Sequence, residues 1–480
     1  MRIVLINPPV RMEGEFKDWK GKLEIYQPLG LQYIAAVLKK AGHEAIILDA
    51  IIEDYKNTGD KWWGLRHTEI AKRVKEIKPD AIGIGGMATM EDSIIKTADE
   101  IKQVADIPIF VGGPYASIKY EDCKKNRSID YIIVGEAENS IGKFVENFQK
   151  GVSIDRVIFS ERTKNLNDLP FPDRQNIDKY FKAARIYRYA RGRQKTSRTV
   201  SIISSRGCPF NCIFCAAKIA VGSIWRPRTV DNIISEMEEC IESYNVTDFY
   251  FEDENMSLSK ERMNNLMDVI ISKRWKIRLH SNQGLRADTL DFDLLKKMKR
   301  AGYDDIAVAP ETGSQKTMDK IIEKKLNLKN VEEVVANCKK IGLDVACFFV
   351  LGFPDETKED IEETLAFMKK IRSMGAFHCT VRNAIPVPNT RLYNESKARG
   401  LLIKDGENLE KVMYITNKHM LNSPNWTPEE IECYVARAKK EDLGDIKLVR
   451  KKYFKNFIKG MVTSPRLTIN AIYKKYRKSP

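Results

Sequence analysis

The sequence predicts an α/β protein with a doubly wound, Rossmann-like parallel sheet, then a partial (β/α)6 barrel and a small, mostly helical C-terminal region. Two observations predict this class. Short apolar segments alternate with amphipathic helical patterns along most of the chain. Within residues 1–150 most of these apolar segments end in Gly, Pro or Asn, where a strand gives way to a turn. At 480 residues the chain exceeds a single typical core, so we expect several domains.

Residues 1–150 are predicted to form the first domain. Its opening, MRIVLINPPV, is expected to be a strand, because it lacks the longer apolar region and cleavage site of a signal peptide. Helical patterns separate the strands, so the strands should pair in parallel and place a ligand at their carboxyl ends. No Gly-x-Gly-x-x-Gly fingerprint supports an NAD site. The expected strands are Arg2–Asn7, Glu44–Leu48, Ala81–Gly85, Ile107–Val111 and Tyr131–Val134.

Residues 151–197 are predicted to be a linker, because NLNDLPFPDRQN is rich in turn-forming residues. Residues 198–392 repeat a strand and a helix six times, which is typical of a partial barrel. The active site of such a barrel lies at the carboxyl ends of its strands. The strands are expected at Thr199–Ser204, Asp248–Phe251, Lys276–His280, Asp305–Ala309, Asp344–Leu351 and His378–Ile385.

Residues 393–480 are predicted to be mostly helical and to end in a basic amphipathic helix. The chain carries 81 Lys and Arg against 66 Asp and Glu, a net charge of +15, and from Lys447 onward it has 11 basic residues and no acid. This tail favours an anionic surface, either lipid or nucleic acid. Packing of the helix against the barrel, or a merely solubilising role, is the alternative. No apolar run is long enough for a membrane span.

Only three of the nine cysteines cluster: Cys208, Cys212 and Cys215, in SSRGCPFNCIFCAAK. Scattered thiols suit a reducing cytoplasm, where a tight triplet indicates metal or cluster ligation rather than disulfides. Three thiolates on one loop can bind three irons of a [4Fe–4S] cubane, which leaves the fourth iron open to a small molecule. Zinc is the alternative, but a zinc site would need a fourth Cys or His, and none occurs near this loop.

The Cys-x3-Cys-x2-Cys spacing after the first barrel strand resembles the radical S-adenosylmethionine (SAM) superfamily. This resemblance implies that the open iron binds SAM. One electron, from a donor such as ferredoxin or flavodoxin, would then cleave SAM to a 5′-deoxyadenosyl radical that abstracts hydrogen from a substrate.

The resemblance extends to FYFEDENMSL, NQGLRAD, APETGSQ and FFVLGFPDE at later strand ends. One carboxylate of the first segment is expected at the SAM amino group, the arginine of the second at its carboxylate, and the glutamate of the third at its ribose. The fourth segment is expected behind the adenine. The implied SAM-binding residues are Phe214, Glu252, Asp253, Glu254, Arg286, Glu311, Val350, Gly352 and Pro354.

Residues 1–150 resemble the cobalamin (B12)-binding domain that precedes the barrel in one large radical SAM group. The matching segments are INPP, QPLGLQYIAAVLKKAGHE, GGPYAS and DYIIVGEAE, with LNDLPFP in the connector. The Asp-x-His-x-x-Gly loop that often supplies an axial histidine is absent, so cobalamin without axial His is implied; a lost corrin site is the alternative. The implied cobalamin-binding residues are Asn7, Pro8, Pro9, Leu29, Gly30, Met87, Thr89, Gly112, Gly113, Gly135 and Glu136.

Together these resemblances imply a cobalamin-dependent radical SAM enzyme, similar to the class B radical SAM methyltransferases. An unactivated carbon is no nucleophile toward SAM, so methyl transfer from methylcobalamin is the expected outcome. Cyclisation, rearrangement or hydroxylation with the same cofactors is the main alternative. RNA modification, prompted by RIYRYARGRQK and the tail, lacks a recognised RNA-binding module. The substrate is expected to be a small molecule or lipid-linked, in the cytoplasm or at the membrane periphery.

Two histidines on predicted barrel strands, His280 and His378, are in reach of a substrate inside the barrel. Histidines on strands are more often satisfied core residues, which is the alternative for both. No catalytic side chain beyond the cofactor ligands is assigned from the sequence.

Overall fold

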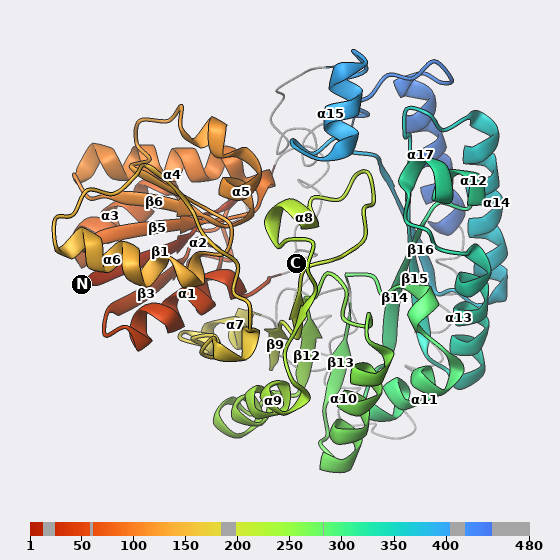
Figure 1. Cartoon of the computed structure of the whole chain (residues 1–480), viewed down its shortest axis with the longest axis horizontal. Helices are drawn as coiled ribbons and strands as arrows, with labels where there is room; N and C mark the ends of the chain where they lie inside the picture. Colours follow the sequence, from red (N-terminus) through yellow and green to blue (C-terminus); the bar gives the residue numbers. More distant parts are fainter. Residues whose placement is uncertain (13–24, 58–60, 184–197, 282, 404–417, 444–480) are drawn as a thin grey trace, which may run out of the picture.

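The computed structural model describes residues 1–12, 25–57, 61–183, 198–281, 283–403 and 418–443 (Figure 1). Within these ranges two α/β units lie side by side, the first from the N-terminal part of the chain and the second built as an open barrel. None of the described helices combines the length and apolar character needed to cross a lipid bilayer.

The N-terminal unit is a parallel sheet in the order β3-β1-β5-β6-β7-β8. Along β1, Ile3 and Leu5 enter the core on one face while Val4 and Ile6 enter the core on the other. Both faces are therefore buried, which explains why the strands are continuously apolar. The strands are β1 (Arg2–Asn7), β3 (Glu44–Asp49), β5 (Ala81–Gly85), β6 (Ile109–Gly112), β7 (Tyr131–Val134) and β8 (Val157–Phe159).

Helices cover both faces of this sheet. Residues of α1 (Leu29–Lys40) and α6 (Ile141–Gln149) share one core. Residues of α3 (His67–Ile77), α4 (Glu91–Val104) and α5 (Gly113–Cys123) share the other. The chain moves from β1 to β3 on one side and then to β5 on the other, so a switch point opens between β1 and β5, where α/β sheets bind ligands. The smaller elements are β2 (Val10–Arg11), α2 (Ala50–Glu53), β4 (Trp62–Trp63) and α7 (Ile177–Ala183).

The sheet extends further along the chain than the sequence predicts. The stretch expected to be a linker from residue 151 contains β8, which pairs in parallel with β7. This strand has three residues and an exposed end, Phe159, so it gives no periodic signal that separates it from a loop.

The second unit contains the six predicted strands, as two parallel three-stranded sheets. One has the order β9-β12-β13 and the other β14-β15-β16. Isolated bridges from Leu279 to Tyr303 and from Leu285 to Val308 link the two sheets into a partial barrel. The strands are β9 (Thr199–Ile202), β12 (Asp248–Phe251), β13 (Arg278–His280), β14 (Asp305–Glu311), β15 (Asp344–Leu351) and β16 (His378–Asn383).

The outer helices of the barrel each begin at a side chain that accepts a hydrogen bond from the first turn. Such caps satisfy amide groups that the helix itself leaves unpaired. The cap of the last helix, Thr357, forms a reciprocal capping box with Asp360. These helices are α9 (Val230–Tyr244), α10 (Lys260–Lys273), α11 (Phe292–Ala301), α13 (Leu328–Ile341) and α14 (Lys358–Met374).

Alternation along the strands separates an outer from an inner face of the barrel. On β15, Val345, Cys347, Phe349 and Leu351 join the core beneath the helices. The residues between them are only partly buried, and they point to the opposite, inner face because side chains alternate along a strand. A Cβ placed on Gly284 would lie 3.0 Å from Ala309 and 3.6 Å from the ring of Phe348. Residues from both sheets therefore meet inside the barrel.

The C-terminal region packs on the outside of the barrel. Helix α17 (Pro428–Leu443) buries Ile431 in the barrel core and is bound to α14 by the ion pairs Lys358–Glu430 and Arg437–Glu362. A shorter helix, α15 (Arg391–Ala398), follows β16. The predicted basic tail from Lys447 and the segment RIYRYARGRQK lie outside the described residues.

Candidate active site

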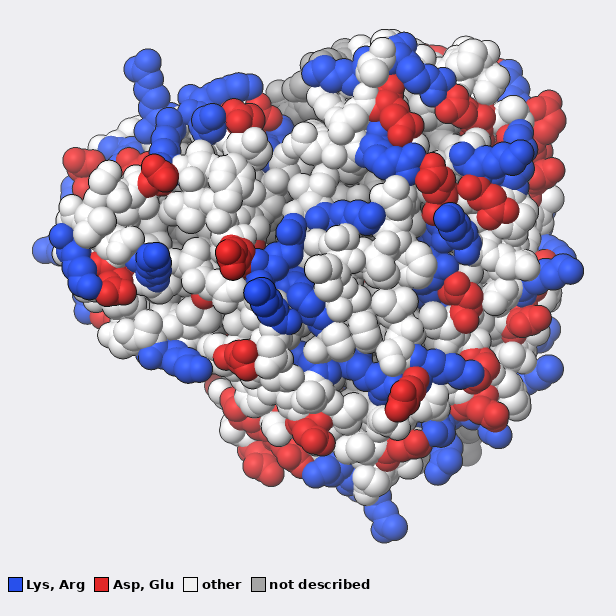
Figure 2. Space-filling view, in the orientation of Figure 1, with Lys and Arg blue, Asp and Glu red and all other residues white. Residues whose placement is uncertain are grey.

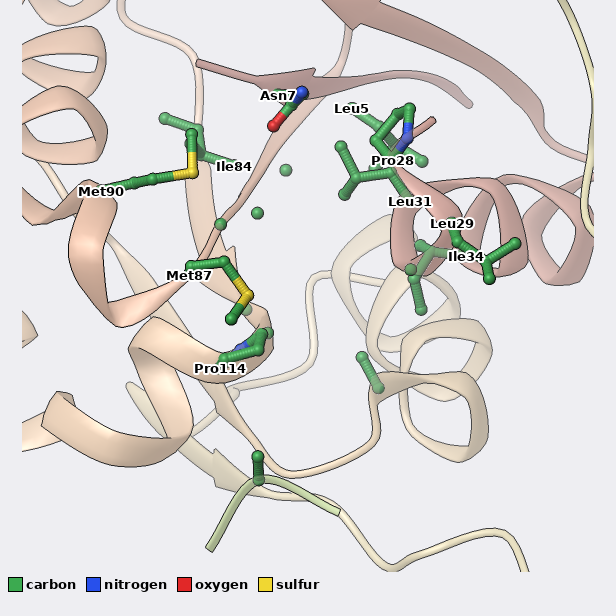
Figure 3. Close-up of a pocket in the computed structure, with 18 of the residues that line it drawn as sticks. Leu5, Asn7, Pro28, Leu29, Leu31, Ile34, Ile84, Met87, Met90 and Pro114 are labelled. Atoms are coloured by element: carbon green, nitrogen blue, oxygen red, sulfur yellow. The ribbon is translucent and has the colours of Figure 1, made fainter. Parts of the chain in front are cut away.

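A cavity of about 770 Å³ lies at the carboxyl edge of the N-terminal sheet and reaches the barrel. Its size is in the range of cofactor pockets, about 300–1,000 Å³. In Figure 3, Met87, Met90 and Pro114 face Leu29, Leu31 and Ile34 of α1 across the open space. The barrel contributes to the lining with Ser201, Ile203, Arg206, Ala220, Val221, Glu252 and Gln283.

Part of the wall of this cavity is formed by glycines, most of them at strand ends. Gly85 and Gly112 end two adjacent strands, and Gly135 follows the next one. A Cβ added to Gly30 would meet nothing within 4 Å, and one added to Gly113 would meet its nearest atom at 3.5 Å. Strand ends without side chains allow a flat macrocycle to approach the sheet closely. A corrin ring fits this cradle.

The predicted cobalamin-binding residues other than Pro8 and Pro9 line the cavity, while these two prolines are buried next to Asn7. No histidine is among the residues found to line it. His67 is buried within hydrogen-bond distance of Ser93, with Nε2 to Oγ at 3.2 Å, and His43 lies 3.5 Å from the amino group of Met1. Sequence reasoning missed Gln27, Trp63 and Met90, whose approach to the cavity depends on long-range packing.

Buried ion pairs hold the two units together at the edge of the cavity. Glu136 accepts two hydrogen bonds from Arg226, at 2.5 and 2.9 Å, and lies 3.5 Å from Arg206. Arg206 also donates to Glu138 at 2.7 Å. The two arginines belong to the hairpin of β10 (Ser205–Arg206) and β11 (Arg226–Pro227), whose strands flank the cysteine loop. The cavity and the cysteine loop therefore share one rigid junction.

Glu136→Gln is expected to destabilise the protein by about 3–5 kcal/mol, because it leaves Arg226 buried without its ionic partner. Burial raises the pKa of Glu136, but Arg226 and Arg206 outweigh burial, so its pKa in the folded protein is lowered. Ionised Glu136 therefore contributes fully to the free energy of unfolding above the ordinary pKa of glutamate. This contribution is lost as the pH falls through the pKa of Glu136 in the folded protein. Urea unfolding at neutral and acidic pH measures both effects.

The exposed Arg2–Glu44 pair, at 2.8 Å, supplies the matched control. Glu44→Gln should cost no more than about 1 kcal/mol because solvent screens that pair. An equal, small loss for both variants would contradict the role given to Glu136.

The cysteine loop connects β10 to α8 (Ala217–Ala220) and is fixed by backbone hydrogen bonds. The Cys208 amide donates to the Gly222 carbonyl at 3.1 Å, and the Ile213 amide donates to the Ile322 carbonyl at 3.1 Å. The carbonyl of Ile213 in turn accepts from the amide of Leu392 at 2.9 Å. The loop is therefore held near its start and in its middle.

The three thiols lie close enough to influence one another electrostatically. Burial raises the pKa of the Cys212 thiol to about 11; the Lys324 charge lowers it, and Cys215, Glu311 and Cys208 raise it. In the described part of the chain, no group of three or more Cys, His, Asp or Glu is placed to hold a single metal ion. In a cubane each thiolate binds a different iron, so the triplet fits a [4Fe–4S] cluster.

The acidic segment after β12 sends its three carboxylates in different directions. Glu252 lines the cavity and accepts hydrogen bonds from Ser201 at 3.1 Å and from Gln283 at 2.6 Å. Asp253 is buried and accepts from the hydroxyls of Ser204 and Ser205, both at 2.6 Å. Glu254 is hydrogen-bonded by the backbone of Gly207, beside the cysteine loop, and burial raises its pKa to about 7.

Two buried cations lie near the loop. Arg286 forms a two-point ion pair with Asp288, at 2.7 and 3.0 Å, and its guanidinium lies 3.6 Å above the ring of Phe210. Lys324 donates to Glu311 at 2.7 Å and to the Ala309 carbonyl. Sequence reasoning missed Lys324, because nothing in EKKLN separates a buried lysine from an exposed one.

The predicted adenine segment spans the end of β15 and the turn after it. Phe353 packs on Phe214 of the cysteine loop with ring centroids 5.8 Å apart, and the Pro354 carbonyl accepts from Ser423. Val350 is partly buried. Gly352 has a φ of +91°, and a Cβ there would lie 2.5 Å from the ring of His419. Only glycine fits this conformation and this close approach.

Gly352→Ala should therefore be among the most destabilising glycine substitutions in the barrel. Gly342→Ala is the control: its φ is +68°, but its Cβ would meet nothing within 4 Å. Gly342→Ala should lower the free energy of unfolding by about 1–2 kcal/mol, the cost of a left-handed backbone for alanine. Gly352→Ala should lower it by about 1–3 kcal/mol more, because its Cβ also overlaps His419. Equal urea midpoints for the two variants would show that His419 moves aside freely.

His280 is the last residue of β13, and its ring lies beside the first residues of two other strands. Its ring nitrogens lie 3.3 Å from Asp248 and 3.4 Å from Asp305, the first residues of β12 and β14. Burial lowers the pKa of His280, but the two carboxylates outweigh burial and the pKa is raised. The alternative of a satisfied core histidine therefore describes His280.

Two family models match the chain, the radical SAM superfamily over residues 202–368 and the B12-binding domain over residues 23–145. An uncharacterized methyltransferase of Pyrococcus horikoshii is 28% identical, and the match covers 91% of each chain. The cytidylyl-2-hydroxyethylphosphonate methyltransferase of Streptomyces wedmorensis is 27% identical over 85% of each chain.

Among solved structures, the chain resembles the radical SAM methyltransferase TsrM of Kitasatospora setae with cobalamin and a [4Fe–4S] cluster bound. The TM-score is 0.63 at 16% sequence identity, and the match covers 83% of this chain and 78% of TsrM. The two family models confirm the predicted order of a B12-binding domain followed by a radical SAM domain, and the likeness to TsrM shows the same fold.

Proposed function

Because the chain belongs to the cobalamin-dependent radical SAM enzymes, we propose that it transfers a methyl group to an unactivated carbon of a small-molecule substrate. The observation that supports this proposal is the single cavity that joins the glycine cradle to Ser201, Glu252 and Gln283 of the barrel. A substrate at this junction would contact both the corrin site and the site beside the cysteine loop. The relatives named as methyltransferases favour methyl transfer over the other radical outcomes.

The residues proposed to hold the cofactors form two sets, one on the cysteine loop and one along the cavity. Cys208, Cys212 and Cys215 would bind the cluster. The cavity residues Gly30, Gly112 and Gly113 would face the corrin. When bound, the cluster with SAM supplies a radical that abstracts hydrogen, and cobalamin supplies the methyl group.

The described side chains would orient SAM from several sides. Glu254, beside Gly207, is proposed for its amino group, and Glu311 for its ribose. Arg286 and Lys324 are both proposed near its carboxylate: Arg286 stacks on the loop at Phe210, and the charge of Lys324 acts on Cys212. A carboxylate and an ammonium that meet away from water form short, strong hydrogen bonds. Asp253, held by two serine hydroxyls, would keep the strand before the loop in place.

The proposal is tested by product mass. The anaerobically reconstituted, reduced enzyme is incubated with a small-molecule extract and with SAM that carries a CD3 methyl group. A product that gains CD3 in place of one hydrogen, together with 5′-deoxyadenosine, is expected. A product that accumulates with 5′-deoxyadenosine but without the label would replace methyl transfer by cyclisation, rearrangement or hydroxylation.

We further propose that the enzyme works in the cytoplasm with a low-potential electron donor such as ferredoxin or flavodoxin. The basic sequence from Lys447 is proposed to contact the membrane surface. Removal of residues 447–480 should abolish binding to anionic liposomes, and unchanged binding would refute that contact.

A further inference from the structure

Strands β15 and β16 form one side of the inner face of the barrel. The inward residues of β15 are Ala346, Phe348 and Val350, and each pairs in register with an inward residue of β16: His378, Thr380 and Arg382. Cys379 and Val381, which alternate with the latter, are buried in the core under the helices. The inward residues are less buried, and Arg382 is exposed. The inner face is therefore apolar along β15 and polar along the adjoining β16.

Charged side chains on the other inner strands have partners. Asp248 pairs with Arg278 at 2.6 Å, and Asp305 with His280 at 3.4 Å. Glu311 pairs with Lys324 at 2.7 Å. Glu252 accepts from Ser201 and Gln283.

Arg382 differs from these groups. Among the described residues it has neither a hydrogen bond nor an ion pair, although it points to the same inner face. The planar fork of its guanidinium matches the two oxygens of a carboxylate or phosphoryl group. An open arginine on a wall that faces a substrate is therefore suited to bind an anion.

We propose that Arg382 binds an oxyanion of the substrate, a carboxylate or a phosphoryl group, with Thr380 on the same face as a second donor. This inference rests on the proposed function, because it takes the barrel interior as the substrate site. Arg382 pairs in register with Val350, so the anion would lie near the predicted adenine segment, at the carboxyl end of the strands. The apolar wall of Ala346 and Phe348 would then receive the hydrocarbon part of the substrate.

The surface where the two units meet is favourable for such a ligand. In Figure 2, Lys and Arg side chains gather at the centre of the face shown, where the two units meet. Clustered positive charge raises the local concentration of anions and speeds their approach.

The test measures binding of small anions to the cofactor-loaded full chain at constant ionic strength. Methylphosphonate is followed by 31P NMR and acetate by 13C NMR, with wild type, Arg382→Ala and Arg382→Lys. Arg300→Ala is the control, since Arg300 is exposed on the outer helix α11. Wild type and the control should bind one anion saturably, and Arg382→Ala should bind it about 10- to 100-fold more weakly. Arg382→Lys should lie between them because it keeps the charge without the fork.

The stronger of the two probes identifies the phosphoryl or the carboxylate class. Equal binding by wild type and Arg382→Ala, or no saturable binding by wild type, would overturn the proposal. Iron and cobalt are measured in the same samples. If iron and cobalt are present but the anion does not bind, or binds equally to wild type and Arg382→Ala, only the role of Arg382 is refuted. If the metals are absent, the proposed function is refuted.

Discussion

Cys212→Ser should eliminate SAM cleavage. Cys212 is the triplet cysteine that packs against the barrel core, and its loop is fixed at Ile213 by hydrogen bonds to two other segments. A serine at this position offers no thiolate, so one iron of the cubane loses its protein ligand. We expect iron to fall from about four atoms per chain to near zero. The rate of 5′-deoxyadenosine formation should fall by about a thousandfold or more, which corresponds to about 4 kcal/mol.

The control for this variant is Cys433→Ser. Cys433 is exposed on α17, on the outside of the barrel, and has no role in the candidate site. This control should keep its iron, the absorption of the cluster and the rate of SAM cleavage. A Cys212→Ser protein with the iron content of wild type would contradict the cluster assignment, because it would show that the triplet does not hold the metal.

Gly30→Phe should prevent cobalamin binding and leave the cluster in place. Gly30 lies in the first turn of α1 and lines the cavity, and a Cβ there meets no atom within 4 Å. A phenyl group added at this point would occupy space that the corrin needs without displacing protein atoms. Replacing glycine in a helix also restricts the unfolded chain, so we expect no loss of stability. Cobalt should fall to near zero, with iron and uncoupled SAM cleavage retained.

Gly142→Phe is the control that distinguishes blocking of the cavity from the general effect of adding a bulky side chain. Gly142 is in the first turn of α6, where an added Cβ also meets nothing within 4 Å, but it does not line the cavity. Its cobalt content should equal that of wild type. If Gly30→Phe also bound cobalamin with wild-type affinity, the corrin would have to lie elsewhere.

The sequence predicted most of the strands because each is an apolar run bounded by turn residues. The segments Asp248–Phe251 and Asp344–Leu351 match the structure residue for residue. Four glycines of the cavity were also predictable, since Gly112 and Gly135 lie at or just after a strand end, and Gly30 and Gly113 open a helix. What the sequence could not predict is the direction of individual side chains.

Two parts of the site show this limit. Glu252, Asp253 and Glu254 are consecutive, yet they contact a cavity, a pair of serines and the cysteine loop. Likewise, the ion pair of Glu136 and Arg226 joins residues 90 positions apart, and neither local sequence contains a signal for the other. Both depend on how the two units pack, which no local pattern encodes.

The central claim is that one chain holds a cluster and a corrin at adjoining sites, and metal analysis of the wild-type protein tests it most directly. The protein is purified anaerobically from cells supplied with cobalamin, and iron, cobalt and corrin are measured per chain. We expect about four iron atoms and about one cobalt atom, with the cobalt recovered as intact corrin. A protein with a complete cluster but no cobalamin, even at saturating supply, would contradict this account.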